Sequence, residues 1–388
     1  MADQTGADPP LAGVRVLEFG QYIAATSAGQ ALADLGADVV KVESPAGDPA
    51  RRLGWKKDDF GPMFVAYNRG KRSVVADLSG EEGRATALRL ALSADVVLQN
   101  ARPGIMQRAG LDAASLRARK PGLIVGSVSG FGADTPYAGR PGFDIAAQAE
   151  SGMMSLNGSA DGPPTRVGFP VVDLMSAGAL TNGVLAALVR RGVSGAGATV
   201  DVALLEVATQ ALAQQWAEVA LSGQIPERRG NGAGNAAPTG EVVQSSDGAI
   251  VVSAFHDSHW AALARALGRE AWITDARFLT AATRFANLAE LQAELRSACA
   301  GKSSEELCEL IAGAGVVVGA VRTLGTVREG VHGLPASLCA QVGGTARGII
   351  DVPARAYRID GLHPAAGRLP GIGEHTQEVL REWPLYAG

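Results

Sequence analysis

The fold is decided by residues 14–43, VRVLEFGQYIAATSAGQALADLGADVVKVE, near the start of the 388-residue chain. Two short runs rich in valine, Val14–Phe19 and Asp38–Glu43, flank the alanine-rich stretch Ala24–Leu35. Such runs are typical of strands buried on both faces, and the stretch between them is typical of a helix. The segment therefore predicts a β-α-β unit with parallel strands.

The same rhythm continues along the first half of the chain. Further strand-like runs occur at 73–78, 95–100, 123–129 and 198–204. Ser79 and Glu82 have the spacing of a capping box for the helix that follows the first of these runs. The alternation predicts an α/β domain with a parallel sheet, whose ligands bind beyond the carboxyl ends of the strands.

A second, smaller α+β unit is indicated after a long helix at 205–221. Residues 223–240 are rich in glycine, proline and asparagine and predict a loop or linker. The pattern that follows predicts a hairpin at 241–255, helices from 260 to about 312 and a strand at 316–321. A last helix is expected at 374–383.

Composition and charge argue against several classes of protein. The chain has 35 basic and 39 acidic residues and only 5% aromatic residues, so a nucleic-acid-binding groove is not expected. Its three cysteines form no CxxC or Cys/His pattern, which argues against a disulfide framework and a structural metal. No secretory signal is recognisable, and Asp173 and Asn182 interrupt the apolar run 171–189. These features predict a cytoplasmic protein without a membrane segment.

The turn after the first strand is where a dinucleotide-binding fold carries its glycine fingerprint. Residues 20–29 read GQYIAATSAG and contain no G-x-G-x-x-G pattern. Glu43 stands where a ribose-binding acid would, but it is a weak signal without the glycines. NAD binding is therefore disfavoured.

Asp173 is the carboxylate whose neighbours point to chemistry. Apolar residues precede it, and the small residues 176–179 follow it at the start of a predicted helix. Two interpretations stay open. Asp173 is either the N-cap of that helix or a nucleophile that the helix dipole keeps ionised.

The stretch 230–240, GNGAGNAAPTG, also allows two interpretations. It is either a plain linker or a lid whose N–H groups face an oxyanion or shield a reactive intermediate.

Several motifs in one order resemble the class III CoA-transferase family, which contains formyl-CoA transferase, carnitine CoA-transferase and α-methylacyl-CoA racemase. The resemblance extends from Leu11 to about Leu380. Its motifs are Leu11–Glu18, Leu32–Glu43, Asn68–Ser73, Asn100–Gly104, Ser129–Gly132, Arg140–Asp144, Asp161–Pro164 and Gly373–Thr376.

The resemblance implies an enzyme whose substrates are a CoA thioester and a carboxylic acid, with no permanently bound cofactor. It implies that Asp173 is the nucleophile. It also implies that the CoA site includes Asn68, Lys71, Asn100 and Arg108, and that the glycine loop includes Gly232 and Gly234.

The resemblance further implies an interlocked homodimer. Each chain would have a Rossmann-like CoA-binding domain at 1–205, a helix and linker at 206–235, a small α+β domain at 236–322, and a segment at 323–388 that returns to the large domain.

Phe143 favours a transferase over a racemase. The racemase branch of the family has a histidine at this position, and a phenyl ring can neither remove nor return a proton. Asp144 is a second candidate catalytic carboxylate that could substitute. The expected path begins with attack of Asp173 on the donor thioester and passes through an aspartyl-CoA thioester.

The alternatives are an α-methylacyl-CoA racemase, and a CoA-binding protein without catalysis, which the presence of Asp173 disfavours. The apolar side chains of Ile23 and Phe143 favour acyl groups with some hydrocarbon over formate or oxalate.

Overall fold

The computed structural model describes residues 9–54, 60–232, 238–329, 339–354, 356–360 and 366–386. The chain forms two compact units. The larger unit comprises Met1–Met153, Val167–Ala217 and Pro335–Gly388, and the smaller unit comprises Met154–Arg166 and Glu218–Leu334.

The larger unit is built on a six-stranded sheet in the order β3-β2-β1-β4-β5-β6, in which every neighbouring pair is parallel. The predicted α/β fold with a parallel sheet is confirmed. The strands are β1 (Arg15–Phe19), β2 (Asp38–Glu43), β3 (Arg72–Val75), β4 (Val96–Gln99), β5 (Ile124–Ser129) and β6 (Ala198–Ala203).

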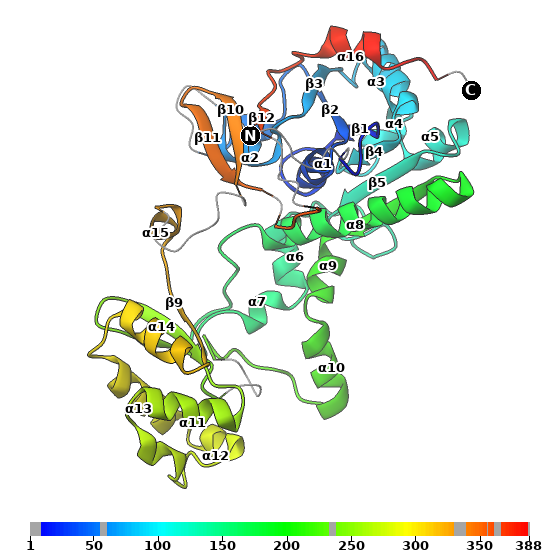
Figure 1. The fold of residues 1–388 in the computed structure, drawn as a ribbon. Coiled ribbons are helices and arrows are strands. Elements are labelled where there is room, and N and C mark those ends of the chain that lie inside the picture. Colours follow the sequence, from blue (N-terminus) through cyan, green and yellow to red (C-terminus); the bar gives the residue numbers. More distant parts are fainter. Residues whose placement is uncertain are drawn as a thin grey trace. The chain divides into compact units, whose positions relative to one another are not determined.

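Helices cover both faces of this sheet (Figure 1). On β1, Val16 packs into one hydrophobic cluster with α1 and α8, whereas Leu17 packs into another with α3 and α16, because successive side chains of a strand point to opposite faces. The helices of the larger unit are α1 (Ala24–Asp34), η1 (Pro49–Arg51), α2 (Pro62–Tyr67), α3 (Glu81–Ser93), α4 (Ile105–Arg108), α5 (Ala113–Arg119), α6 (Asp144–Glu150), α7 (Met153–Leu156, at the unit boundary), α8 (Val171–Ser194), α9 (Leu204–Gln210), α10 (Ala213–Ser222, which continues into the smaller unit) and α16 (Thr376–Glu382).

The helix α8 is long and apolar enough to cross a membrane by length and composition alone. In the fold its buried residues, among them Val172, Leu180 and Val184, belong to the cluster that covers the sheet. We therefore interpret α8 as a core helix of the larger unit.

The C-terminal segment packs against the first strands of the same sheet. The indole Nε1 of Trp383 donates to Asp38 at 2.9 Å, and Arg72 pairs with Asp38, Glu378 and Glu382. A three-stranded sheet, β11-β10-β12, belongs to this unit. Its strands are β10 (Cys339–Thr345), β11 (Gly348–Pro353) and β12 (Gly367–Arg368).

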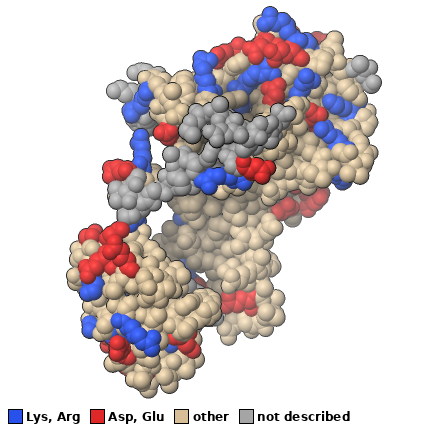
Figure 2. Space-filling view, in the orientation of Figure 1, with Lys and Arg blue, Asp and Glu red and all other residues tan. Residues whose placement is uncertain are grey.

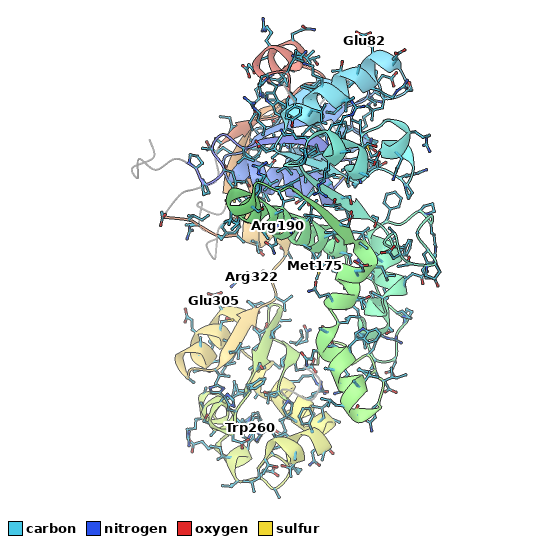
Figure 3. All side chains as sticks on the ribbon, turned by 90° about the vertical axis from the view of Figure 1, so that its right-hand side faces the viewer. Glu82, Met175, Arg190, Trp260, Glu305 and Arg322 are labelled. Carbon is cyan, nitrogen blue, oxygen red and sulfur yellow. The ribbon has the colours of Figure 1, made fainter. Side chains whose placement is uncertain are left out.

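The smaller unit has an antiparallel sheet, β7-β8-β9, covered by helices. Trp260 and Arg284 are buried in its core, and the guanidinium of Arg284 lies over the Trp260 ring. At the surface Arg322 pairs with Glu305 at 3.1 Å (Figure 3). Its elements are β7 (Glu241–Gln244), β8 (Ala249–Ser253), α11 (Asp257–Ala266), η2 (Glu270–Ile273), α12 (Ala281–Ala286), α13 (Leu288–Cys299), α14 (Ser304–Gly313), β9 (Val317–Ala320) and α15 (Leu324–Arg328).

Three sequence-based expectations differ from the structure. Ser79 does not cap α3, because its backbone N–H and its hydroxyl both donate to Asp77. The helix expected at 205–221 is two helices, α9 and α10, separated by a turn at 211–212. Residues 154–166 belong to the smaller unit, although the predicted boundary placed them in the large domain.

Candidate active site

A cavity of about 570 Å³ lies at the carboxyl ends of the strands of the large sheet. Its walls come from the segments that follow β1 to β5, together with residues 138–143 and Asp173. The lining includes Gln21, Tyr22, Ile23, Glu43, Ser44, Asp77, Ser79, Asn100, Arg102, Ser129, Arg140, Phe143, Asp173 and Leu204. This is the edge at which parallel sheets bind ligands, as the strand pattern predicted.

Asp173 lies in the first turn of α8 but does not cap it. The N-cap position is occupied by Pro170, which has no side-chain hydrogen bond to the helix. The carboxylate of Asp144 serves instead, because its Oδ2 accepts hydrogen bonds from the backbone N–H groups of Val172 at 2.7 Å and Asp173 at 3.2 Å. The N-cap interpretation of Asp173 is therefore wrong, and its side chain is left to line the cavity.

Asp144 is fully engaged in this task. It is buried, and its second oxygen accepts a hydrogen bond from Nε2 of Gln148 at 2.6 Å. Gln148 is itself fully buried and accepts from the backbone N–H of Val167 through Oε1 at 2.8 Å. This corrects the expectation that Asp144 is a second catalytic carboxylate. It supports the helix that carries Asp173, so it is a positioning residue.

The pKa of Asp173 also differs from the expectation that the helix dipole keeps this carboxylate ionised. Burial, with a further contribution from the charge of Asp144, raises the pKa of Asp173 to about 7. The helix dipole does not outweigh the loss of hydration. Burial, with a further contribution from the negative charge of Asp173, also raises the pKa of Tyr67. Among the described residues, no side chain donates a hydrogen bond to the Asp173 carboxylate, which leaves its oxygens available to a ligand.

The turn between β1 and α1 forms another wall of the cavity. The side chain of Asn100 bonds to both backbone groups of Gln21, accepting from N–H at 2.9 Å and donating to the carbonyl at 2.8 Å. The next residue, Tyr22, has a φ of 61° and places its ring edge-on to that of Phe143, with centroids 6.0 Å apart. Asn100 therefore lines the cavity, and its side-chain amide is bonded to the protein.

Lys71 and Asn68 are placed differently from the prediction. Nζ of Lys71 is completely buried, where it donates to Glu18 at 2.6 Å, to the carbonyl of Thr26 at 2.8 Å and to Asn68 at 3.3 Å. Asn68 donates in turn to the carbonyl of Phe64. Neither side chain lines the cavity. We correct the expectation that these two side chains contact CoA directly, because the polar ends of both are hydrogen-bonded inside the protein.

A buried charge network surrounds Glu18. Lys41 pairs with Glu18 at 2.9 Å and with Asp48 at 2.9 Å, and Lys71 approaches the other oxygen of Glu18. Burial alone would lower the pKa of Lys41, but Glu18 and Asp48 raise it. Burial lowers the pKa of Lys71 to about 8, although Glu18 opposes this shift.

The sequence analysis missed this network. Its signal was present, since Glu18 and Lys41 are charges within strands expected to be buried on both faces. Such charges need a partner of opposite sign.

The remaining predicted residues are distributed over both units. Arg108 is exposed at the end of α4, next to the cavity segment 100–106, but it does not line the cavity. Gly232 belongs to the smaller unit, where its N–H donates to the carbonyl of Arg229. Gly234 lies outside the described residues. Within the described ranges, no group of three or more His, Cys, Asp or Glu side chains is arranged to hold a metal ion.

The sequence profile of CoA-transferase family III matches residues 11–376 of the chain. The chain belongs to CoA-transferase family III.

On the face drawn in Figure 2, acidic and basic side chains are mixed, which is in keeping with the small net charge of the chain.

Relatives in this family have similar lengths. A probable fatty acyl-CoA transferase of Mycobacterium tuberculosis is 37% identical over 387 residues, with 96% of this chain and 97% of that protein covered. The succinate–glutarate CoA-transferase of Agrobacterium fabrum is 39% identical over 306 residues, with 75% of each protein covered. A CaiB/BaiF family protein from Brucella suis has a similar crystal structure, with a TM-score of 0.87, 32% identity, and coverage of 97% of this chain and 100% of that chain.

Proposed function

We propose that this family III CoA-transferase moves CoA from an acyl-CoA thioester to a free carboxylic acid through an aspartyl-CoA thioester on Asp173. The observation that carries the proposal is the placement of Asp173. Its carboxylate lines the cavity without a side-chain donor among the described residues, while Asp144 caps the helix in its place. A carboxylate held in this way is available for covalent catalysis.

The first half-reaction consumes the donor. A carboxylate oxygen of Asp173 attacks the carbonyl carbon of the donor thioester, the C–S bond breaks, and CoA leaves as the thiolate. The thiolate then attacks the side-chain carbonyl carbon of the mixed anhydride. The donor acid leaves as a carboxylate, and Asp173 carries CoA as a thioester.

The second half-reaction mirrors the first. The acceptor carboxylate attacks the aspartyl thioester and releases CoA thiolate, giving a second anhydride. The thiolate attacks the acceptor carbonyl, forms the new acyl-CoA and restores the Asp173 carboxylate. No net proton is exchanged, so the chain needs no general base for the transfer. Water must be kept from both anhydrides, because each would hydrolyse.

The cavity lining supports a preference for acyl groups with a hydrocarbon part. Tyr22, Ile23, Phe143 and Leu204 give the wall shared with Asp173 an apolar character. A racemase is disfavoured, because Phe143 lies in this wall and cannot transfer a proton. We also propose that the protein is an interlocked homodimer, as the family resemblance implies.

Trapping the aspartyl intermediate tests the proposal. The native enzyme is incubated with acyl-CoA and digested, and the peptide that holds Asp173 is expected to carry CoA by mass spectrometry. Hydroxylamine is expected to convert it to the hydroxamate. Asp173→Asn should show neither product, because an amide cannot form the anhydride. Asp275→Asn, which keeps Asp173 and changes a carboxylate paired with Arg277 in the smaller unit, should still form the adduct. Turnover by Asp173→Asn within tenfold of the native rate would refute the mechanism.

The acyl preference is tested separately with paired donors and acids of increasing chain length. A preference for oxalate over larger acids would contradict it.

A further inference from the structure

Tyr22 has a backbone conformation that large side chains rarely adopt. Its φ of 61° lies in the left-handed region, which is costly for a residue with a Cβ atom. Among the described residues that are not glycine, only Tyr22 and Asp360 have a positive φ. Conformations of this kind persist when surrounding contacts hold them, and they gather at functional sites.

Contacts hold the turn at each of its first three residues. The side-chain amide of Asn100 bonds to the N–H and the carbonyl of Gln21, as a neighbouring strand would. The carboxylate of Asp48 accepts from the N–H of Tyr22 at 3.4 Å. Nζ of Lys41, the buried partner of Asp48, donates to the carbonyl of Gly20 at 2.6 Å. Among Asn100, Asp48 and Lys41, Asn100 is the residue whose side-chain acceptor and donor both bond to the turn.

The conformation of Tyr22 determines one wall of the cavity. Its ring meets the Phe143 ring at an interplanar angle of 89°, and both residues line the cavity together with Asp173. Phe143 directly precedes Asp144, whose carboxylate bonds to the backbone N–H of Asp173. A continuous set of contacts therefore leads from Asn100 through Tyr22 and Phe143 to the nucleophile's helix.

We infer that Asn100 is a positioning residue, which holds the Gln21–Tyr22 turn in its left-handed conformation so that the Tyr22 and Phe143 rings form the wall against which the acyl group lies during transfer. The inference rests on the proposed function for its chemical consequence, but the holding of the turn does not depend on it. It replaces the expectation that the Asn100 amide contacts CoA directly, because both of its polar atoms are occupied by Gln21.

Loss of the amide should affect the reaction more than binding. In Asn100→Ala the turn can leave the left-handed region, and the Tyr22 ring can move away from Phe143. Reacting groups that are misplaced by about 1 Å lose roughly 100-fold in rate. We expect kcat to fall by 10- to 100-fold and KM for acyl-CoA to change by less than about threefold. A direct CoA ligand would show the opposite result, an increased KM with kcat retained.

The experiment combines hydrogen exchange with steady-state kinetics. Exchange of a peptide covering residues 20–24 is followed by mass spectrometry in the native enzyme and in Asn100→Ala, without substrate. Asn100→Asp is the second variant, because it keeps the acceptor for the Gln21 N–H and loses the donor to the Gln21 carbonyl. Asn287→Ala is the matched control, since the Asn287 side chain likewise makes two hydrogen bonds to the backbone, donating to the carbonyls of Arg277 and Thr283 in the smaller unit.

The inference is supported if exchange of the turn is at least tenfold faster in Asn100→Ala and is faster by a smaller factor in Asn100→Asp, if kcat falls in both, and if the Asn287 variant changes neither quantity. It is overturned if exchange of the turn stays at the native rate, or if KM rises while kcat is kept. If the native enzyme transfers no CoA, the proposed function fails, and the exchange result alone still decides whether Asn100 holds the turn. If Asn100→Ala does not fold, Asn100→Asp is judged by the same criteria.

Discussion

Oδ2 of Asp144 accepts a hydrogen bond from the backbone N–H of Asp173 at 3.2 Å, so one carboxylate supports the helix that carries the other. Helix N-termini leave N–H groups without partners, and an acidic side chain in the first turn often satisfies one of them. Here the partner comes from α6, 29 positions earlier in the chain. The division of tasks leaves the Asp173 carboxylate directed at the cavity and places a second negative charge behind it.

This pair predicts the pH dependence of the reaction. The nucleophile must be ionised, so kcat/KM should rise with pH through an apparent pKa of about 7 and then level off. In Asp144→Asn the second charge is absent, and the rise should move to lower pH. Burial remains and is the larger cause, so the shift should be partial. The measurement is kcat/KM for acyl-CoA between pH 5 and about pH 9. An unchanged midpoint in Asp144→Asn would contradict the role of that charge.

The same shift predicts a pH-dependent effect of Asp173 on stability. A carboxyl whose pKa rises from 3.8 to about 7 on folding keeps its proton in the native state while the unfolded chain loses it. The free energy of unfolding therefore falls as pH rises through this window. The side chain of Asp173→Asn cannot ionise, so its free energy of unfolding lacks this decrease. The variant should match the native protein near pH 4 and be more stable at pH 8, by at most about 4 kcal/mol. Urea unfolding at the two pH values checks this. Equal stabilities at pH 8 would refute it.

The buried network predicts that Lys71 acts on stability. Lys71→Ala removes one of the two cations that neutralise Glu18, and breaking a buried ion pair from one side costs about 3 kcal/mol. Arg277→Ala is the matched control, because it removes the cation of the exposed Arg277–Asp275 pair, where solvent screens the charges and a much smaller loss of stability is expected. Denaturant unfolding distinguishes the two. A stable Lys71 variant with weakened acyl-CoA binding would restore the expectation that Lys71 belongs to the CoA site.

The oligomeric state provides an independent prediction. The helix α10 has no buried side chain in a single chain, and its apolar residues Trp216 and Leu221 are exposed at 61% and 89%. Exposed apolar surface of this kind marks contact sites. Sedimentation at sub-micromolar concentration should give twice the chain mass of 39.7 kDa, without dissociation on dilution. A stable, active monomer would exclude the interlocked dimer.

Local patterns predicted the sheet well and the site only in part. The strand Asp38–Glu43 was expected with its exact bounds, because the alternation of valines is a local signal. The pairing of Lys41 with Glu18 was not expected, because it depends on β2 lying beside β1. The residue that caps α8 could not be predicted either, because Asp144 reaches the N–H groups of Val172 and Asp173 only in the folded chain. A helix N-terminus can take its partner from a distant segment, and sequence distance does not reveal which.

The wall formed by Phe143 and Tyr22 predicts that the protein does not racemise its substrates. Racemisation of a 2-methylacyl-CoA requires removal of the α-proton on one face and its return on the other. The Phe143 ring lines the cavity and has no transferable proton, and the Asp144 carboxylate is occupied by N–H donors of Val172, Asp173 and Gln148. Asp173 alone could reach one face. Incubation of (2R)-2-methylacyl-CoA in D₂O should therefore leave its configuration unchanged over many transferase turnovers. Incorporation of solvent deuterium at C2 together with formation of the 2S epimer would show that a second proton donor exists, and Tyr22 would then be the first residue to replace.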